Sequence, residues 1–150
     1  MKTNPKYFQD IQPGEVITLG PRPLTEEDSL RFCNEFDRLP FHLDPAQAKN
    51  SIYGQLIASG LHTLSLTASI VVDGFLVHTS MTGASGMESM RWHRPVTLPN
   101  QLSVRVTVLE TKPPIPGKRY GVVKCMLETL GQDGDLVMSA TVNYLLELRV

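Results

Sequence analysis

The sequence predicts an α+β domain in which an antiparallel β-sheet wraps around a long central helix. Two patterns lead to this prediction. Residues 59–72 form an apolar stretch of helical character, and from residue 88 onward apolar and polar residues alternate with a period of two. A sheet can bury one face by curling around such a helix. The chain has 150 residues, a length that one hydrophobic core commonly serves, so we expect a single domain over residues 1–150.

The first predicted elements are a short strand at residues 15–20 and a helix that follows it. Pro21 and Pro23 are expected to end the strand. Thr25 is suited to cap the helix, and acidic residues fill the first turn, where the helix dipole favours them. The face of this helix predicted to point inward carries Leu30, Cys33 and Phe36.

The stretch "EFDRLPFHLDP" at residues 35–45 predicts a break between two helices. The first helix cannot continue far past Asp37, because the residue before Pro40 is pushed out of the α region. Asp44 followed by Pro45 has the pattern of an N-cap with proline at the first helical position. We therefore expect a short helix through about residue 49, with His42 in a tight connector between the two helices.

The central helix is expected to begin at Ser59 and Gly60, and small residues along its surface predict that the sheet surrounds it on several sides. Four strands should follow, at residues 88–96, 102–111, 120–130 and 135–148. The sequence "GQDGD" at residues 131–135 is a strong turn signal, which makes the last two strands a hairpin. We predict that the four strands form an antiparallel meander, and the whole plan has the outline of a hot-dog fold.

Composition excludes several classes of partner. The formal net charge is -1 and the basic residues are scattered, so we expect no nucleic-acid binding. No apolar segment follows the first lysine, which argues against a secretory signal and predicts a cytoplasmic protein. The apolar run "LIASGLHTLSLTASIVV" contains too many polar residues for a bilayer span, so no membrane association is expected. The two cysteines are interpreted as reduced core thiols.

Asp37 and His42 are the first candidates for chemistry. A water held between a carboxylate and an imidazole can lose one proton to one group while the other handles the second proton, as addition of water to a polarised double bond requires. The alternative from the residues alone is that Asp37 accepts hydrogen bonds from turn amides and His42 packs in the connector. Asp44 is sufficiently explained as a helix cap and is not counted as catalytic.

Ser59 and Gly60 are the second candidates. Ser59 can cap the central helix, and the Gly60 amide at the helix N-terminus can hold an anion or a developing oxyanion. The alternative is a glycine needed only for close packing of helix on sheet. His62 is interpreted as a structural residue. His42 and Asp44 without a third ligand make a weak metal signal, so we expect no metal, and no dinucleotide or phosphate-binding loop predicts a cofactor.

Three segments of the chain resemble the MaoC-like acyl dehydratases, a family that includes the (R)-specific enoyl-CoA hydratases. They are "FDRLPFHLDPAQA", "YGQLIASGLHT" and "RWHRPV" with "LSVRVTVLE" after it. The resemblance implies a hot-dog fold that pairs into a dimer with acyl-CoA at the subunit interface. It also implies that Asp37 and His42 are the catalytic pair and that the Gly60 amide, preceded by Ser59, holds the thioester oxygen. Leu39 departs from the family pattern, in which many members carry asparagine.

The resulting hypothesis is a hydratase or dehydratase that interconverts a trans-2-enoyl thioester and a 3-hydroxyacyl thioester, with acyl-CoA as substrate and no cofactor. We expect a homodimer or a dimer of dimers. Two alternatives remain from the sequence: an acyl-CoA thioesterase on the same fold, and a non-catalytic protein that binds acyl thioesters. The residues expected to shape the pocket are Phe41, Tyr53 and Phe75.

Overall fold

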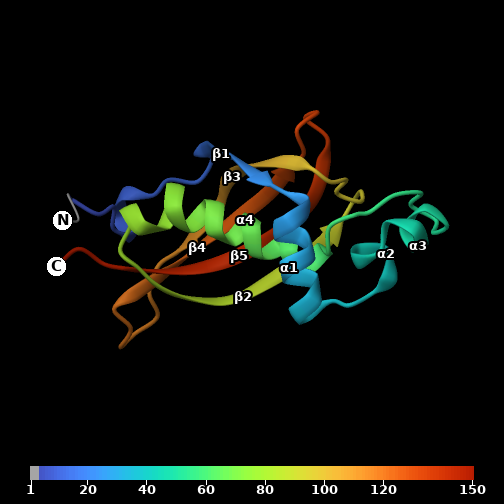
Figure 1. The fold of residues 1–150 in the computed structure, drawn as a ribbon. Helices are drawn as coiled ribbons and strands as arrows, with labels where there is room; N and C mark the ends of the chain where they lie inside the picture. The colour runs from blue at the N-terminus through green and yellow to red at the C-terminus, as the bar shows by residue number, and fades with distance from the viewer. Residues whose placement is uncertain (1–3) are drawn as a thin grey trace.

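A computed structural model describes residues 4–150 of the chain. The fold is a five-stranded antiparallel sheet whose inner face holds the helix α4 (Figure 1), and it is a hot-dog fold of the α+β class. The strands are β1 (Val16–Leu24), β2 (Met81–Trp92), β3 (Asn100–Lys112), β4 (Tyr120–Leu130) and β5 (Leu136–Glu147). The helices are α1 (Glu26–Phe36), α2 (Pro40–Leu43), α3 (Pro45–Lys49) and α4 (Gly60–Gly74), with short 3-10 turns η1 (Phe8–Asp10) and η2 (Leu76–His78).

The order of strands in the sheet is β1-β3-β4-β5-β2, and each neighbouring pair is antiparallel. The meander prediction is therefore correct for β3, β4 and β5 and wrong for β2, which pairs with β5 at the edge of the sheet. The hairpin at residues 131–135 is confirmed. Gly134 in this turn has φ +82°, a left-handed conformation that glycine adopts without steric cost.

Strand β1 continues through the two prolines that were expected to end it. Pro23 pairs with Gln101 of β3, and the register shifts between Leu19 and Arg22. The strand lies at the edge of the sheet, where proline is tolerated because one row of backbone groups faces no neighbouring strand. Strand β2 also differs from the prediction, because it begins at Met81 rather than at residue 88.

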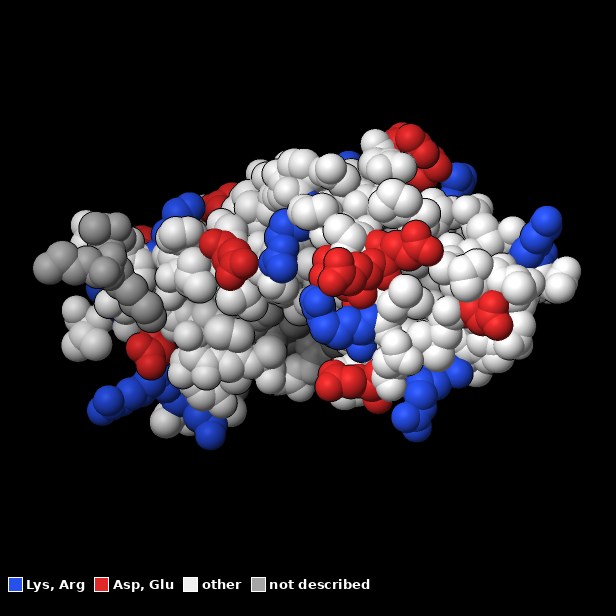
Figure 2. All heavy atoms as spheres, in the orientation of Figure 1, with Lys and Arg blue, Asp and Glu red and all other residues white. Residues whose placement is uncertain are grey.

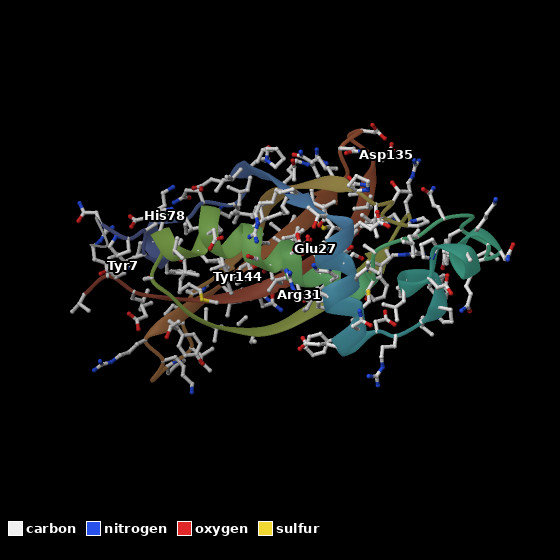
Figure 3. The ribbon with its side chains drawn as sticks, in the orientation of Figure 1. Tyr7, Glu27, Arg31, His78, Asp135 and Tyr144 are labelled. Atoms are coloured by element: carbon white, nitrogen blue, oxygen red, sulfur yellow. The ribbon has the colours of Figure 1, made fainter. Side chains whose placement is uncertain are left out.

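The core lies between α4 and the sheet. The inner residues of β3 and β4 are almost completely buried, among them Val104, Val106 and Leu127 at 0 to 2% exposure. Leu66, Ile70 and Val71 of α4 are buried against them. Tyr144 of β5 lies in this layer (Figure 3), and burial raises the pKa of its hydroxyl.

The segment Gly60–His78 is long and apolar enough to span a bilayer by length and composition, with a mean hydropathy of 1.5. In the structure it is the core helix with the turn that follows it. Its other face carries Leu61 and Val72, which are 45% and 40% exposed. The predicted wrapping of the sheet around the central helix is confirmed, and in one copy of the chain the side of the helix that carries these two residues stays uncovered.

Helix α1 begins as expected, with the Thr25 hydroxyl accepting a hydrogen bond from the Asp28 amide at 3.0 Å. Cys33 is fully buried, but Phe36 is 65% exposed, so its predicted place on the inner face is wrong. Phe36 stands at the last turn of α1, where the helix leaves the core for the segment of α2 and α3 that projects from the body (Figure 1).

Charged side chains of both signs are scattered over the face shown in Figure 2, with an acidic group over α1 that includes Glu27 and basic residues beside it. Arg31 pairs with Asp28 at 2.7 Å on the same helix. This face therefore carries no continuous basic surface of the kind that nucleic-acid binding uses.

Candidate active site

The chain reversal between α1 and α3 brings Asp37 and His42 together. Asp37 is the C-terminal cap of α1, where its amide donates to the Cys33 carbonyl at 3.0 Å. Pro40 then starts α2 at its first position, which has no need of an amide donor. His42 lies in this single turn, so the expected connector is itself a short helix. The imidazole Nε2 of His42 lies 3.3 Å from Asp37 Oδ2.

The second imidazole nitrogen sets the tautomer of His42. His42 Nδ1 lies 2.8 Å from the Ile57 carbonyl oxygen. A carbonyl only accepts hydrogen bonds, so Nδ1 carries a proton and donates it. Nε2 then faces the carboxylate as an acceptor unless a second proton is present. Asp37 Oδ2 and His42 Nε2 therefore both face each other as hydrogen-bond acceptors. A proton shared between them, or a water that donates to both, gives each of them a donor.

Burial strengthens this arrangement. The His42 side chain is 6% exposed and that of Asp37 is 20% exposed. An ion pair or a proton transfer in such a site is screened less by solvent than one at the surface. The pair still reaches a cavity, because both residues line it.

Ser59 connects the pair to the central helix. Its hydroxyl donates to Asp37 Oδ2 at 2.7 Å and accepts from the Leu61 amide at 3.2 Å. The predicted N-cap of α4 is confirmed, and the same oxygen also orients the carboxylate. Ser59 is fully buried, so it contacts Asp37 from the protein interior. Its expected role in substrate binding stays a prediction.

Gly60 is the first residue of α4 and lines the same cavity as Asp37 and His42. Amides in the first turn of a helix have no partner within the helix and favour negative charge. A Cβ atom at this position would lie 2.4 Å from a ring atom of Trp92. Close packing therefore requires glycine at this position, with the Trp92 side chain of β2 as the packing partner. The proposed contact between the Gly60 amide and a substrate oxygen stays a prediction.

The cavity has a volume of about 400 Å³. Phe41 and Tyr53 line it as expected, with their rings 5.3 Å apart. The expectation for Phe75 is wrong, because this residue follows the other end of α4 and is buried in the core. Trp92, the last residue of β2, also lines the cavity, together with His93 and Arg94 that follow it. Sequence reasoning assigned these three residues no role in the site.

The remaining candidates have structural roles. Asp44 caps α3 by accepting from the Ala46 amide at 2.9 Å. Hydrogen bonds from the Gln47 side chain, and then from the Ala46 and Gln47 amides, lower the pKa of its carboxyl. His62 stacks on Phe32 of α1, with ring centroids 4.6 Å apart, and burial lowers its pKa. Within residues 4–150, no three His, Cys, Asp or Glu side chains gather in a way that could hold a metal ion.

The fold and the site together define a hot-dog domain with a half-buried carboxylate and a buried imidazole beside the N-terminus of its central helix. Residues 9–127 match the family model described as MaoC like domain. The chain therefore belongs to the MaoC-like dehydratase domain family.

Individual relatives agree with this assignment. Protein MaoC of Klebsiella aerogenes is 34% identical over 103 residues, which are 68% of this chain and 30% of that protein. The chain thus spans about 30% of the length of that curated relative. The monoamine oxidase regulatory protein from Archaeoglobus fulgius has a solved structure with a TM-score of 0.90 at 32% identity, covering 100% of this chain and 99% of that one.

The unliganded (R)-hydratase PhaJ1 from Pseudomonas aeruginosa is more distant. Its structure has a TM-score of 0.77 at 24% identity, and the alignment covers 95% of this chain and 86% of that one. At this identity the comparison supports the fold.

Proposed function

We propose that this chain is a hydro-lyase that adds water reversibly across the double bond of a trans-2-enoyl-CoA, giving the 3-hydroxyacyl-CoA. The observation that carries the proposal is the 3.3 Å approach of His42 Nε2 to Asp37 Oδ2 in the wall of a cavity that Gly60 also lines. Membership of the MaoC-like dehydratase family supports the reaction class, and the relative PhaJ1, an (R)-hydratase, is consistent with it.

Each group has a distinct role in the proposed reaction. A water in the cavity that contacts both Asp37 and His42 loses a proton to one of them as its oxygen bonds to C3 of the enoyl group. The group that took this proton then delivers it to C2, so the net change is addition of one water and the pair returns to its starting state. The Gly60 amide and the helix dipole stabilise the negative charge that develops on the thioester oxygen.

Assembly as a homodimer is part of the proposal. Large apolar side chains beside the site are exposed in one copy, with Phe36 at 65%, Leu61 at 45% and Trp92 at 50%. Strand β2 also lies at a sheet edge, where unpaired backbone groups favour a partner. Light scattering after size-exclusion chromatography tests this assembly, and a monomer at micromolar concentration would contradict it.

The experiment that tests the reaction is a spectrophotometric screen of trans-2-enoyl-CoAs of increasing chain length, run in parallel with a reagent that traps free thiol. A hydratase removes the absorbance of the conjugated double bond and releases no thiol. Release of thiol would identify a thioesterase. Saturable binding with neither signal would identify a binding protein, and either result would overturn the proposal.

A further inference from the structure

Trp92 makes a contact with the central helix that the proposed reaction does not yet use. It is the last residue of β2 and the single tryptophan of the chain. Its indole Nε1–H donates to the Gly60 carbonyl oxygen at 3.0 Å. The side chain lines the cavity, and the residue is 50% exposed, so one part of the ring holds the helix while another part remains open to a ligand.

The indole ring also lies directly over Gly60. A Cβ atom at Gly60 would come within 2.4 Å of ring atom Cε2 and 2.5 Å of Nε1. These distances are far below van der Waals contact, so the ring and the glycine backbone are packed with no space for a side chain. Trp92 therefore sets the wall of the cavity at the start of α4.

A continuous chain of hydrogen bonds leads from this indole to the catalytic pair. Trp92 bonds to the carbonyl of the peptide group between Gly60 and Leu61. The N–H of that same peptide group donates to Ser59 Oγ at 3.2 Å, and Ser59 Oγ donates to Asp37 Oδ2 at 2.7 Å. Because hydrogen bonds in series polarise one another, a donor at the carbonyl end strengthens the amide donor that holds Ser59.

We propose that Trp92 is a positioning residue for the hydration reaction. Its indole N–H fixes the first peptide group of α4 and, through Ser59, the Asp37 carboxylate. Its ring is the surface against which the thioester end of the ligand packs. This inference rests on the proposed function for its kinetic part only, because the contact between ring and ligand is measurable without turnover.

The kinetic test compares Trp92→Phe with the unmodified protein. Phenylalanine keeps an aromatic ring over Gly60 and removes the N–H. Loss of one hydrogen bond of ordinary strength predicts a fall in kcat of about three- to tenfold, with KM changed by less than about twofold. Trp92→Leu removes the aromatic wall as well, so KM should also rise.

Ser65→Ala is the matched control. Ser65 also donates a side-chain hydrogen bond to a backbone carbonyl of α4, that of Leu61 at 2.9 Å, but it lies on the exposed side and outside the chain of bonds to Asp37. Its kcat should equal that of the unmodified protein. Circular dichroism and the urea midpoint verify that each variant is folded.

Ligand binding is followed by the emission of Trp92 itself. Butyryl-CoA is the probe, because its saturated acyl chain cannot be hydrated. We expect a saturable change in emission as the half-exposed indole is covered. An emission change without hydration of any enoyl-CoA would refute the proposed function and support the contact between the Trp92 ring and the ligand. Wild-type kcat and KM in folded Trp92→Phe would refute the positioning role of Trp92 without affecting the proposed hydration reaction. Competitive inhibition by butyryl-CoA without an emission change would refute the contact between the Trp92 ring and the ligand.

Discussion

Replacement of Ser59 by alanine is expected to lower both the stability and the activity of the protein. The variant loses the cap of α4, which is worth about 1 kcal/mol on average. It also loses the 2.7 Å bond to Asp37, and a bond to a charged group contributes about 1.5–3 kcal/mol. Asp37 keeps 20% exposure, so water recovers part of that loss. The expected decrease in the free energy of unfolding is therefore about 2–3 kcal/mol.

The activity should fall for a separate reason. Ser59 and His42 both contact Oδ2 of Asp37. Without Ser59 the carboxylate is held only by its contact with His42 at 3.3 Å, so it can rotate away from the catalytic geometry. A loss of about 1.4 kcal/mol in the transition state corresponds to a tenfold decrease in kcat. Equal protein concentrations are needed in all unfolding experiments, because the proposed dimerisation would add to apparent stability.

The assay is urea-induced unfolding followed by circular dichroism, with Ser65→Ala as the control. Ser65 lies on the exposed side of α4, where substitutions usually change stability by less than about 0.5 kcal/mol. If Ser59→Ala is as stable as Ser65→Ala and keeps the wild-type kcat, Ser59 neither caps the helix effectively nor orients Asp37, and the reasoning is wrong.

Three further results are expected. Asp44→Ala should lose about 1 kcal/mol of unfolding free energy, because Asp44 caps α3, and thermal unfolding would refute this if its midpoint did not change. His62 has a lowered pKa from burial, so the unfolded chain binds its proton more readily and stability falls as pH drops from about 6.5 towards the folded pKa. His62→Phe should lose less stability over that acid range in urea titrations, and an identical pH dependence would refute the assignment. Burial raises the pKa of Cys33, and it raises that of Cys125 to about 12, so iodoacetamide should label neither thiol at neutral pH until urea is added. Rapid labelling of the native protein would contradict the buried positions.

The local elements were predictable because their signals lie in short stretches of sequence. Thr25, Asp44 and Ser59 each precede a helix and each proves to be its cap. The strands β3 and β4 alternate so regularly that one face is almost fully buried. The spacing of Asp37 and His42 around Pro40 left their mutual geometry open, and only the family resemblance implied that they act as a pair; in the structure the two side chains lie 3.3 Å apart.

The errors arise where sequence distance hides a contact. Strand β2 begins with "MTGASGM", whose small and exposed residues show no alternation, and its partner β5 lies far along the chain. The prolines of β1 are tolerated only because that strand is at an edge. Phe36 was placed inside from helical periodicity alone, although the core no longer covers α1 at its last turn.

The role of Trp92 could not be derived from periodicity, because its partner Gly60 is on another element. The single available signal was an aromatic residue beside a histidine and an arginine in the middle of the strand predicted at residues 88–96. The pairing becomes visible only when β2 and α4 are placed together, where the indole bonds to the Gly60 carbonyl.

The most direct test of the central claim is the hydration rate of crotonyl-CoA with Asp37→Asn, measured as loss of the absorbance of the conjugated double bond. Asparagine preserves the shape of the side chain and removes its basicity, so kcat should fall by about 10²- to 10⁴-fold. Asp44→Asn is the control, since asparagine is an equally good cap, and it should retain the wild-type rate. A wild-type rate in folded Asp37→Asn would contradict the account.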